Sequence, residues 1–139
     1  MLFRSATKEA PVHENVKNAL VKASELDTRL VMRALRNTER VLNNKGVEHL
    51  LEVEREKGKG LKIDDIHEQV AGVYPKVMID GDMDAGAWSC GMVVGLINDV
   101  PTVKELIDRI MTESEQIIRK RLTGFLDGAV DNAATRAVA

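Results

Sequence analysis

Three aspartates alternate in the segment Asp80, Asp82 and Asp84, and alternating carboxylates are typical of calcium-binding loops. Such a loop also requires a glutamate at its twelfth position. Counted from Asp80, that position is Gly91, so the pattern excludes an EF-hand. We therefore expect these carboxylates to lie at the positive N-terminal end of the helix that follows them.

Histidine and cysteine do not assemble a recognisable centre either. His13, His49 and His67 lie in separate predicted elements, and none has a zinc-type partner three or four residues away. Cys90 has no histidine or basic neighbour in the sequence that would lower its pKa. No phosphate loop, dinucleotide fingerprint or nucleophile elbow occurs. The sequence predicts no metal site and no nucleophilic cysteine, and these motifs name no reaction.

The glycine-bearing segment over residues 86–95 (GAWSCGMVVG) is the most unusual part of the chain. Gly91 and Gly95 lie on one face of a predicted helix, where another backbone can approach closely. Tight helix packing is one interpretation, and a ligand or neighbouring domain at this face is the other. Trp88, the only tryptophan, lies beside the face, where its large ring can close a pocket.

Apolar residues recur at helical spacing along most of the chain. Helices are therefore predicted over residues 12–25, 38–53, 63–73, 85–98 and 103–125. Thr38 is the expected N-cap of the second helix, and Thr102 with Glu105 forms a capping box for the last. Only Ser114 interrupts the apolar stripe of that last helix. Residues 28–35 are compatible with a strand or a helix.

Glycine and proline mark the expected interruptions. Gly46 allows a break in the second helix, and the charged, glycine-bearing stretch over residues 54–62 is expected to be a surface loop. Pro75 should end or kink the helix before it, and Gly124 and Gly128 should close the last helix.

These elements predict an all-α fold of about five helices. Aromatic residues make up only 3% of the chain, so the core must be aliphatic. The expected organisation is an extended N-terminal segment over residues 1–11, one helical domain over residues 12–126 and a frayed tail over residues 127–139.

The charge balance excludes broad classes of partner. The formal net charge is −2 with both signs interspersed, so no positive field is available for nucleic acid or an anionic membrane. The longest uncharged run, residues 85–97, is shorter than the roughly 18 residues of a membrane span. The first residues do not resemble a signal peptide, and a lone cysteine is typical of a reducing compartment. We expect a soluble cytoplasmic protein.

Two stretches carry a family resemblance. One covers residues 6–17 (ATKEAPVHENVK), and the other covers residues 81–102 (GDMDAGAWSCGMVVGLINDVPT). In this order and spacing they resemble the C-terminal part of nitronate monooxygenase (2-nitropropane dioxygenase) flavoproteins and of the related FMN-dependent enoyl reductases. The resemblance covers roughly residues 6–126. It implies the helical part that follows the (β/α)₈ barrel of these enzymes.

The chain also departs from that family. We expect the FMN-binding barrel to be absent from this chain, and Leu2, Phe3, Arg4 and Ser5 stand where the family has a Gly-Thr-Arg-Phe-like turn at the FMN phosphate. Met92 occupies a position where many relatives have glutamine. No catalytic residue can be transferred, and the chain alone is expected to bind no FMN.

The resemblance implies that this helical part covers the flavin edge. Five residues would face the flavin or substrate: Asp84, Ala85, Gly86, Trp88 and Met92. The implied function is that of a partial flavin oxidoreductase, whose family reaction is the oxidation of alkyl nitronates, acting with a barrel-containing partner. The alternative is a stand-alone, non-catalytic helical module that forms a homo-oligomer. A third possibility is a small-molecule sensor that uses the same face and is stabilised by its ligand.

Overall fold

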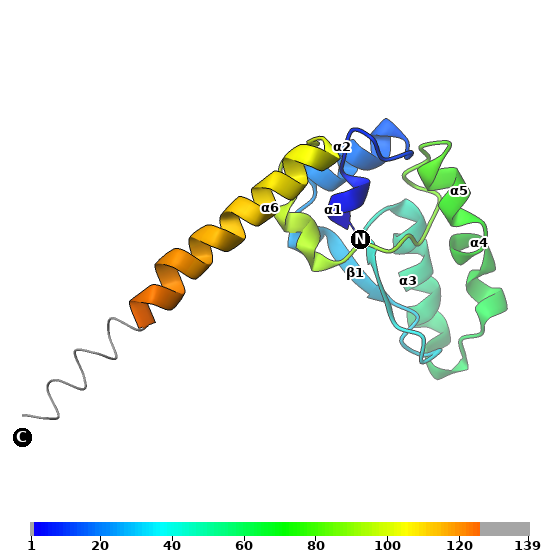
Figure 1. The fold of residues 1–139 in the computed structure, drawn as a ribbon. Coiled ribbons are helices and arrows are strands. Elements are labelled where there is room, and N and C mark those ends of the chain that lie inside the picture. The colour runs from blue at the N-terminus through cyan, green and yellow to red at the C-terminus, as the bar shows by residue number, and fades with distance from the viewer. Residues whose placement is uncertain (1, 126–139) are drawn as a thin grey trace, which may run out of the picture. The chain divides into compact units, whose positions relative to one another are not determined.

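The computed structural model describes residues 2–125, with side chains from residue 4 onward. The chain divides into two compact units, with the boundary between Pro101 and Thr102 (Figure 1). The predicted tail over residues 127–139 and Gly128 lie outside the described residues. Among residues 2–125, no helix is both long and apolar enough to cross a membrane.

The first unit is mostly helical but contains a small sheet. Its helices are α1 (Leu2–Ser5), α2 (Glu14–Lys22), α3 (Lys45–Lys57), α4 (His67–Val70) and α5 (Val73–Met78), and its strands are β1 (Thr28–Val31) and β2 (Glu39–Leu42). Short 3₁₀ helices are η1 (Glu25–Asp27), η2 (Gly58–Gly60), η3 (Ile63–Ile66) and η4 (Met92–Leu96). The predicted helix over residues 12–25 is confirmed as the shorter α2. The N-terminal segment is not extended throughout, because it begins with α1.

The antiparallel pair β1–β2 corrects the all-α prediction. Thr28 pairs with Leu42 and Val31 pairs with Glu39, so most of residues 28–42 forms a hairpin. Met32 and Arg36 adopt positive φ angles of 59° and 55° in the connection, which lets the chain reverse. A four-residue strand is too short for a periodicity argument. The pairing of these two short strands could therefore not be predicted from the local pattern.

Helix α3 begins later than predicted. Its N-cap is Asn44, whose side-chain oxygen accepts a hydrogen bond from the backbone N–H of Val47 at 2.9 Å, and Thr38 lies in the hairpin connection. The helix extends to Lys57, through the start of the expected loop, and ends at Gly58 with a positive φ. Gly46 does not break the helix and lies in its first turn.

The predicted helix over residues 63–73 is divided into η3, α4 and α5. The interruption is Gly72, whose left-handed φ of 68° separates α4 from α5. Pro75 does not end a helix, because it lies in the first turn of α5, where its missing N–H removes no helical hydrogen bond.

The predicted helix over residues 85–98 is wrong. Its first half is irregular and extended, and only η4 is helical. Gly86 has a φ of 142°, which no helix contains, and the N–H of Ala87 donates to the carbonyl of Gln69 at 2.7 Å. Ser89 forms a bridge with Val41 of β2. The backbone hydrogen bonds of this segment therefore go to other elements and not to its own next turn.

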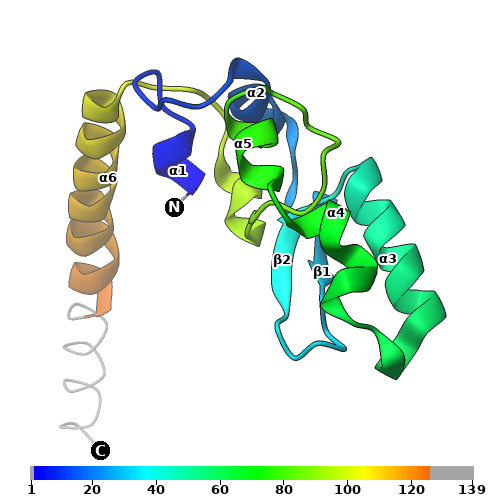
Figure 2. The same ribbon diagram turned by 90° about the vertical axis from the view of Figure 1, so that its right-hand side faces the viewer.

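Two apolar clusters hold the first unit together. One surrounds Trp88 and includes Val16 and Leu20 of α2, all at most 1% exposed. The other lies between the hairpin and α3, around Val41 and Leu50, both completely buried. Figure 2 shows α3 and α4 alongside the two strands. The loop over residues 81–91 links the clusters, because Ala87 belongs to the second and Trp88 to the first.

The second unit is the predicted last helix, and its capping box is confirmed. Helix α6 (Val103–Ile117) continues into a π-helical turn, η5 (Ile118–Leu122), and Gly124 lies in a further helical turn instead of ending the helix. The N–H of Glu105 donates to the Thr102 hydroxyl at 3.2 Å, and the N–H of Thr102 donates to the Glu105 carboxylate at 2.7 Å. No residue of α6 or η5 is buried.

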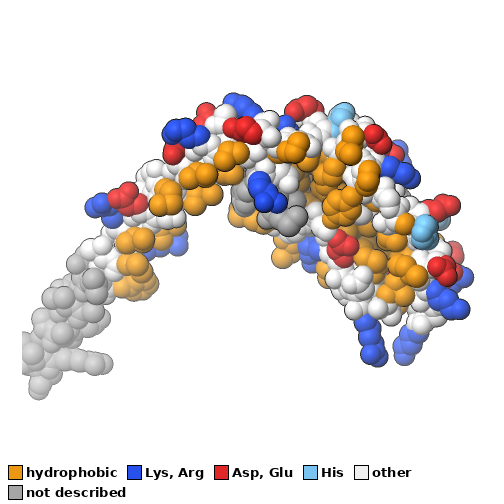
Figure 3. All heavy atoms as spheres, turned by 45° about the vertical axis from the view of Figure 1, so that its right-hand side comes forward, with side chains coloured by type: hydrophobic (Ala, Val, Ile, Leu, Met, Phe, Trp, Pro, Cys, Tyr) orange, Lys and Arg blue, Asp and Glu red, His pale blue; other side chains and the backbone are white. Residues whose placement is uncertain are grey.

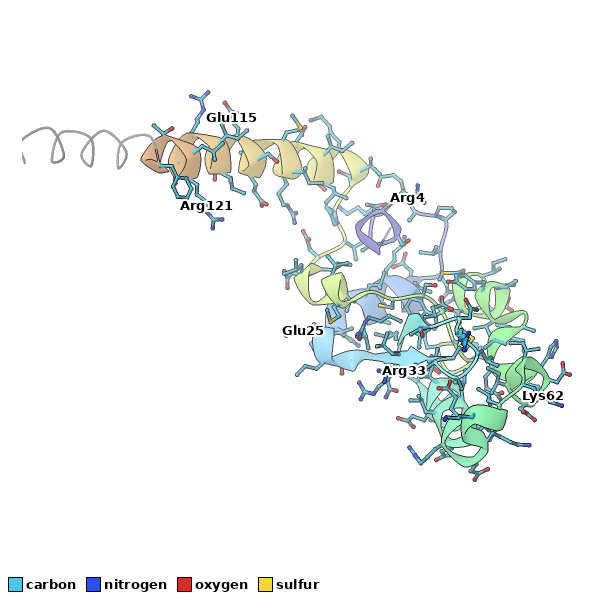
Figure 4. All side chains as sticks on the ribbon, turned by 90° about the horizontal axis from the view of Figure 1, so that it is seen from below. Arg4, Glu25, Arg33, Lys62, Glu115 and Arg121 are labelled. Carbon is cyan, nitrogen blue, oxygen red and sulfur yellow. The ribbon has the colours of Figure 1, made fainter. Side chains whose placement is uncertain are left out.

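Large apolar side chains therefore remain exposed along α6 and η5, and Figure 3 shows them as a row on the helix. We call this row the α6 stripe: Val103, Ile107, Ile110, Met111, Ile117, Ile118 and Leu122. Ser114 lies within the row, and its hydroxyl donates to the carbonyl of Ile110 at 2.7 Å. Figure 4 shows Glu115 and Arg121 on different sides of the same helix.

Candidate functional site

The carboxylate of Asp84 is bound by Lys45, the first residue of α3. The carboxylate accepts a hydrogen bond from the backbone N–H of Lys45 at 3.2 Å and pairs with the Lys45 ammonium at 3.0 Å. These contacts hold the pKa of Asp84 below its ordinary value, the side-chain hydrogen bond from Lys45 contributing most. The carboxylate thus lies at the positive end of α3, an earlier helix, and not of the helix that follows it in the sequence.

Gly86 marks a close approach between the loop and two helices. A Cβ at Gly86 would lie 2.3 Å from the carbonyl oxygen of Gln69, and one at Gly46 would lie 2.6 Å from the Gly86 Cα. The Gly86 carbonyl also accepts a hydrogen bond from the Asn44 side chain at 2.9 Å. Glycine is required here because the backbones touch, which is a packing role.

Trp88 is 1% exposed and lines a pocket of about 310 Å³. Val16 and Leu20 of α2, Met78 of α5 and Val93 contribute apolar walls to the pocket. The indole Nε1 of Trp88 is buried and has no hydrogen-bond partner. Its ring is therefore part of the core and of the pocket wall, and it is not available on the outer surface.

A polar network lies at this pocket. The Tyr74 hydroxyl donates to the Ser89 hydroxyl at 2.6 Å, and the Ser89 hydroxyl donates to the Glu39 carboxylate. The Ser89 N–H donates to the Tyr74 oxygen at 3.0 Å. Arg40 also lines the pocket. These residues could not be identified from the sequence, because the hairpin and the bridge at Ser89 bring them together from distant positions.

Met92 lies at the start of η4 and is 56% exposed. It is the only large apolar residue of the predicted site that is exposed. Val93 and Leu96 on the same short helix and Leu26 on the contacting η1 are also exposed. We call these four residues the η1–η4 patch. A Cβ at Gly95 would lie 2.6 Å from the Glu25 carboxylate, so the two elements touch closely, and Figure 4 shows Glu25 next to η4.

A second, polar pocket of about 500 Å³ contains the remaining predicted residues, Asp84 and Ala85. His49, His67 and Lys76 also line it. In residues 2–125, no three histidine, cysteine or acidic side chains are grouped to hold a metal ion. The five predicted site residues are therefore distributed among a polar pocket, a close backbone contact, an apolar pocket and an exposed patch.

Cys90 is 1% exposed and lines the apolar pocket. Burial raises the pKa of its thiol to about 11. The thiol is therefore protonated at neutral pH, and a protonated thiol is a poor nucleophile.

The predicted residues do not fit FMN on their own. Asp84 is engaged by Lys45, Gly86 is in contact with another backbone, and the Trp88 ring is in the core. Residues 2–5, for which the resemblance implied a departure from the family's phosphate-binding turn, form a short helix. Only Met92 retains a side chain free to meet a cofactor held by other residues.

The fold is similar to that of FabK from Thermotoga maritima. Over 87% of this chain and 37% of that one, the two are 26% identical, with a TM-score of 0.74. A point variant of the same FabK gives 26% identity over 87% of this chain and 34% of that one, with a TM-score of 0.70. The chain thus spans about a third of the length of these structures.

The sequence itself matches a family model. The match covers residues 5–113, and the model is that of nitronate monooxygenase. It includes both stretches on which the resemblance was based, the hairpin and most of α6. The chain therefore belongs to the nitronate monooxygenase family of flavin oxidoreductases.

Proposed function

We propose that this chain is the C-terminal helical part of a nitronate monooxygenase-like oxidoreductase and covers an FMN site held by a barrel-containing partner. The reaction would be the oxidation of an alkyl nitronate, as in the family, or the NAD(P)H-dependent reduction carried out by the related enoyl reductases. FMN would supply the redox chemistry. The contribution of this chain would be a wall that keeps water from the reacting groups.

The observation that carries the proposal is the η1–η4 patch. Met92, which the resemblance places beside the flavin or substrate, is exposed together with Leu26, Val93 and Leu96. A contiguous apolar surface of this kind is typical of an interaction site. This chain matches only about a third of each FabK chain. The other two thirds of such a protein are the kind of partner against which this surface could pack.

Capture of a flavin-bearing partner tests the proposal. Immobilised full-length chain should retain a partner that carries FMN in stoichiometric amount, and the complex should oxidise an alkyl nitronate. A parallel assay with NADH and an enoyl thioester would distinguish the two reactions. The double variant Met92→Glu, Leu96→Glu should lose the partner and keep the melting temperature, because both side chains are exposed.

Ile79→Glu is the matched control, since Ile79 is 71% exposed at the end of α5 and lies outside the patch. It should capture as much flavin as the unmodified chain. Equal capture by the patch variant, or captured protein without flavin, would contradict the proposal.

A second candidate function is a non-catalytic oligomerisation module, and the α6 stripe favours it. None of the side chains in the stripe is buried, although they follow helical spacing over five turns. Ser114 donates its hydroxyl proton to its own helix, so its donor would remain satisfied in an apolar contact. Sedimentation equilibrium should show a stable homo-oligomer that Ile110→Glu dissociates. A monomer at all concentrations would exclude this function.

A further inference from the structure

The pocket beside Trp88 has the features of a ligand site, and it shares only Val93 with the η1–η4 patch. Its volume of about 310 Å³ is at the lower end of the range for small-molecule pockets, roughly 300–1,000 Å³. Val16, Leu20, Met78 and Val93 give it apolar walls, and Trp88 adds a large aromatic surface. It lies entirely within the first unit, so it needs no partner chain to be complete.

The charge that lines this pocket is positive. Among the described residues that line it, Arg40 is the only charged one. One guanidinium N–H, on Nη1, donates to the Thr28 hydroxyl at 2.8 Å, and no other N–H of this side chain has a partner among the described residues. Arginine has five such donors, so this one has donors to offer a ligand.

Ser5 lines the pocket with a neutral hydroxyl, and the other two polar side chains are already engaged. Tyr74 and Ser89 are hydrogen-bonded to each other, and Ser89 also donates to Glu39, which is outside the lining. Cys90 is protonated, so it adds no negative charge. A ligand that gains a charge-assisted contact here must therefore bring acceptors to Arg40.

We propose that this pocket binds a small organic carboxylate, with its apolar body against Trp88 and Met78 and its carboxylate on the guanidinium of Arg40. A carboxylate matches a guanidinium because two parallel N–H groups can donate to its two oxygens. An acceptor brought near the ring would also explain why the buried Nε1 of Trp88 has no partner in the protein. Binding at this pocket does not require flavin.

Trp88 supplies the measurement, because it is the only tryptophan in the chain and lines the pocket. Titration of the full chain with phenylacetate should change the tryptophan fluorescence and saturate. Phenylacetamide has the same shape without the charge and should bind about tenfold more weakly, as expected when a hydrogen bond to a charged group is weakened. Equal binding of the two probes, or no saturable change with phenylacetate, would overturn the proposal.

Two variants locate the site. Arg40→Gln should weaken phenylacetate binding about tenfold, whereas Arg33→Gln, an exposed arginine in the hairpin connection, should leave it unchanged. Val93→Phe should also weaken binding, because it fills the pocket and leaves Arg40 in place. This second variant keeps the test decisive if Arg40→Gln lowers the melting temperature. Unaltered binding by both pocket variants would overturn the proposal. Arg40 lies outside the η1–η4 patch, so the result for Arg40→Gln does not bear on flavin capture there.

Discussion

Single residues of the predicted site have structural duties that their family resemblance did not reveal. Asp84 caps α3 through Lys45, and Gly86 allows the loop to touch the backbone near Gln69. Trp88 is a core residue. Met92 alone has a well-exposed apolar side chain. Three of the five predicted site residues thus have a structural role in this fold.

Asp84→Ala should lower the free energy of unfolding by about 1 kcal/mol at neutral pH, as the loss of a helix cap does. Because the folded pKa of Asp84 lies below its ordinary value of 3.8, the contribution is complete above that pH and declines as the pH falls through the folded pKa. Urea unfolding measures the free energy of unfolding of both proteins from neutral to acidic pH. The difference between Asp84→Ala and the unmodified chain should become smaller as the pH falls.

Asp80→Ala is the control from the same acidic run, since Asp80 is exposed and no hydrogen bond or ion pair is seen for its side chain among the described residues. It should change stability by less than about 0.5 kcal/mol. A stability difference for Asp84→Ala that does not change with pH, or an equal loss of stability in Asp80→Ala, would show that the contact between Asp84 and Lys45 does not stabilise the fold.

The elements that could be predicted from the sequence are those stabilised by contacts between neighbouring residues. The capping box of α6 and the helix α2 depend on neighbouring residues, and both could be predicted from spacing. The β1–β2 hairpin, the bridge at Ser89 and the irregular path near Gly86 depend on contacts between distant segments. The pocket residues Arg40 and Tyr74 were missed for the same reason.

The loop near Gly86 should be the element most sensitive to a single methyl group. Gly86→Ala places a Cβ 2.3 Å from a carbonyl oxygen at a φ of 142°, so we expect a loss of more than about 2 kcal/mol in the free energy of unfolding. Gly60→Ala, which meets open space, should change it by less than about 0.5 kcal/mol. Chemical denaturation measures both, and similar stability of the two variants would refute this account of the loop.

The whole molecule has a formed core and unpaired apolar surfaces. The first unit buries two clusters but leaves the η1–η4 patch exposed, and the second unit buries none of the α6 stripe. Family membership could be predicted from two stretches of sequence, because both recur in the matched region. The partner of these surfaces could not, since one sequence contains only one side of an interface.

The most direct measurement is the visible absorption spectrum of the purified chain after incubation with excess FMN and desalting. We expect no retained flavin, because Asp84, Gly86 and Trp88 hold the fold together and the described residues form no complete site for the cofactor. Stoichiometric flavin is expected only when the captured partner is present. Flavin retained in stoichiometric amount by the chain alone would mean that this chain holds the cofactor itself and does not cover one held by other residues.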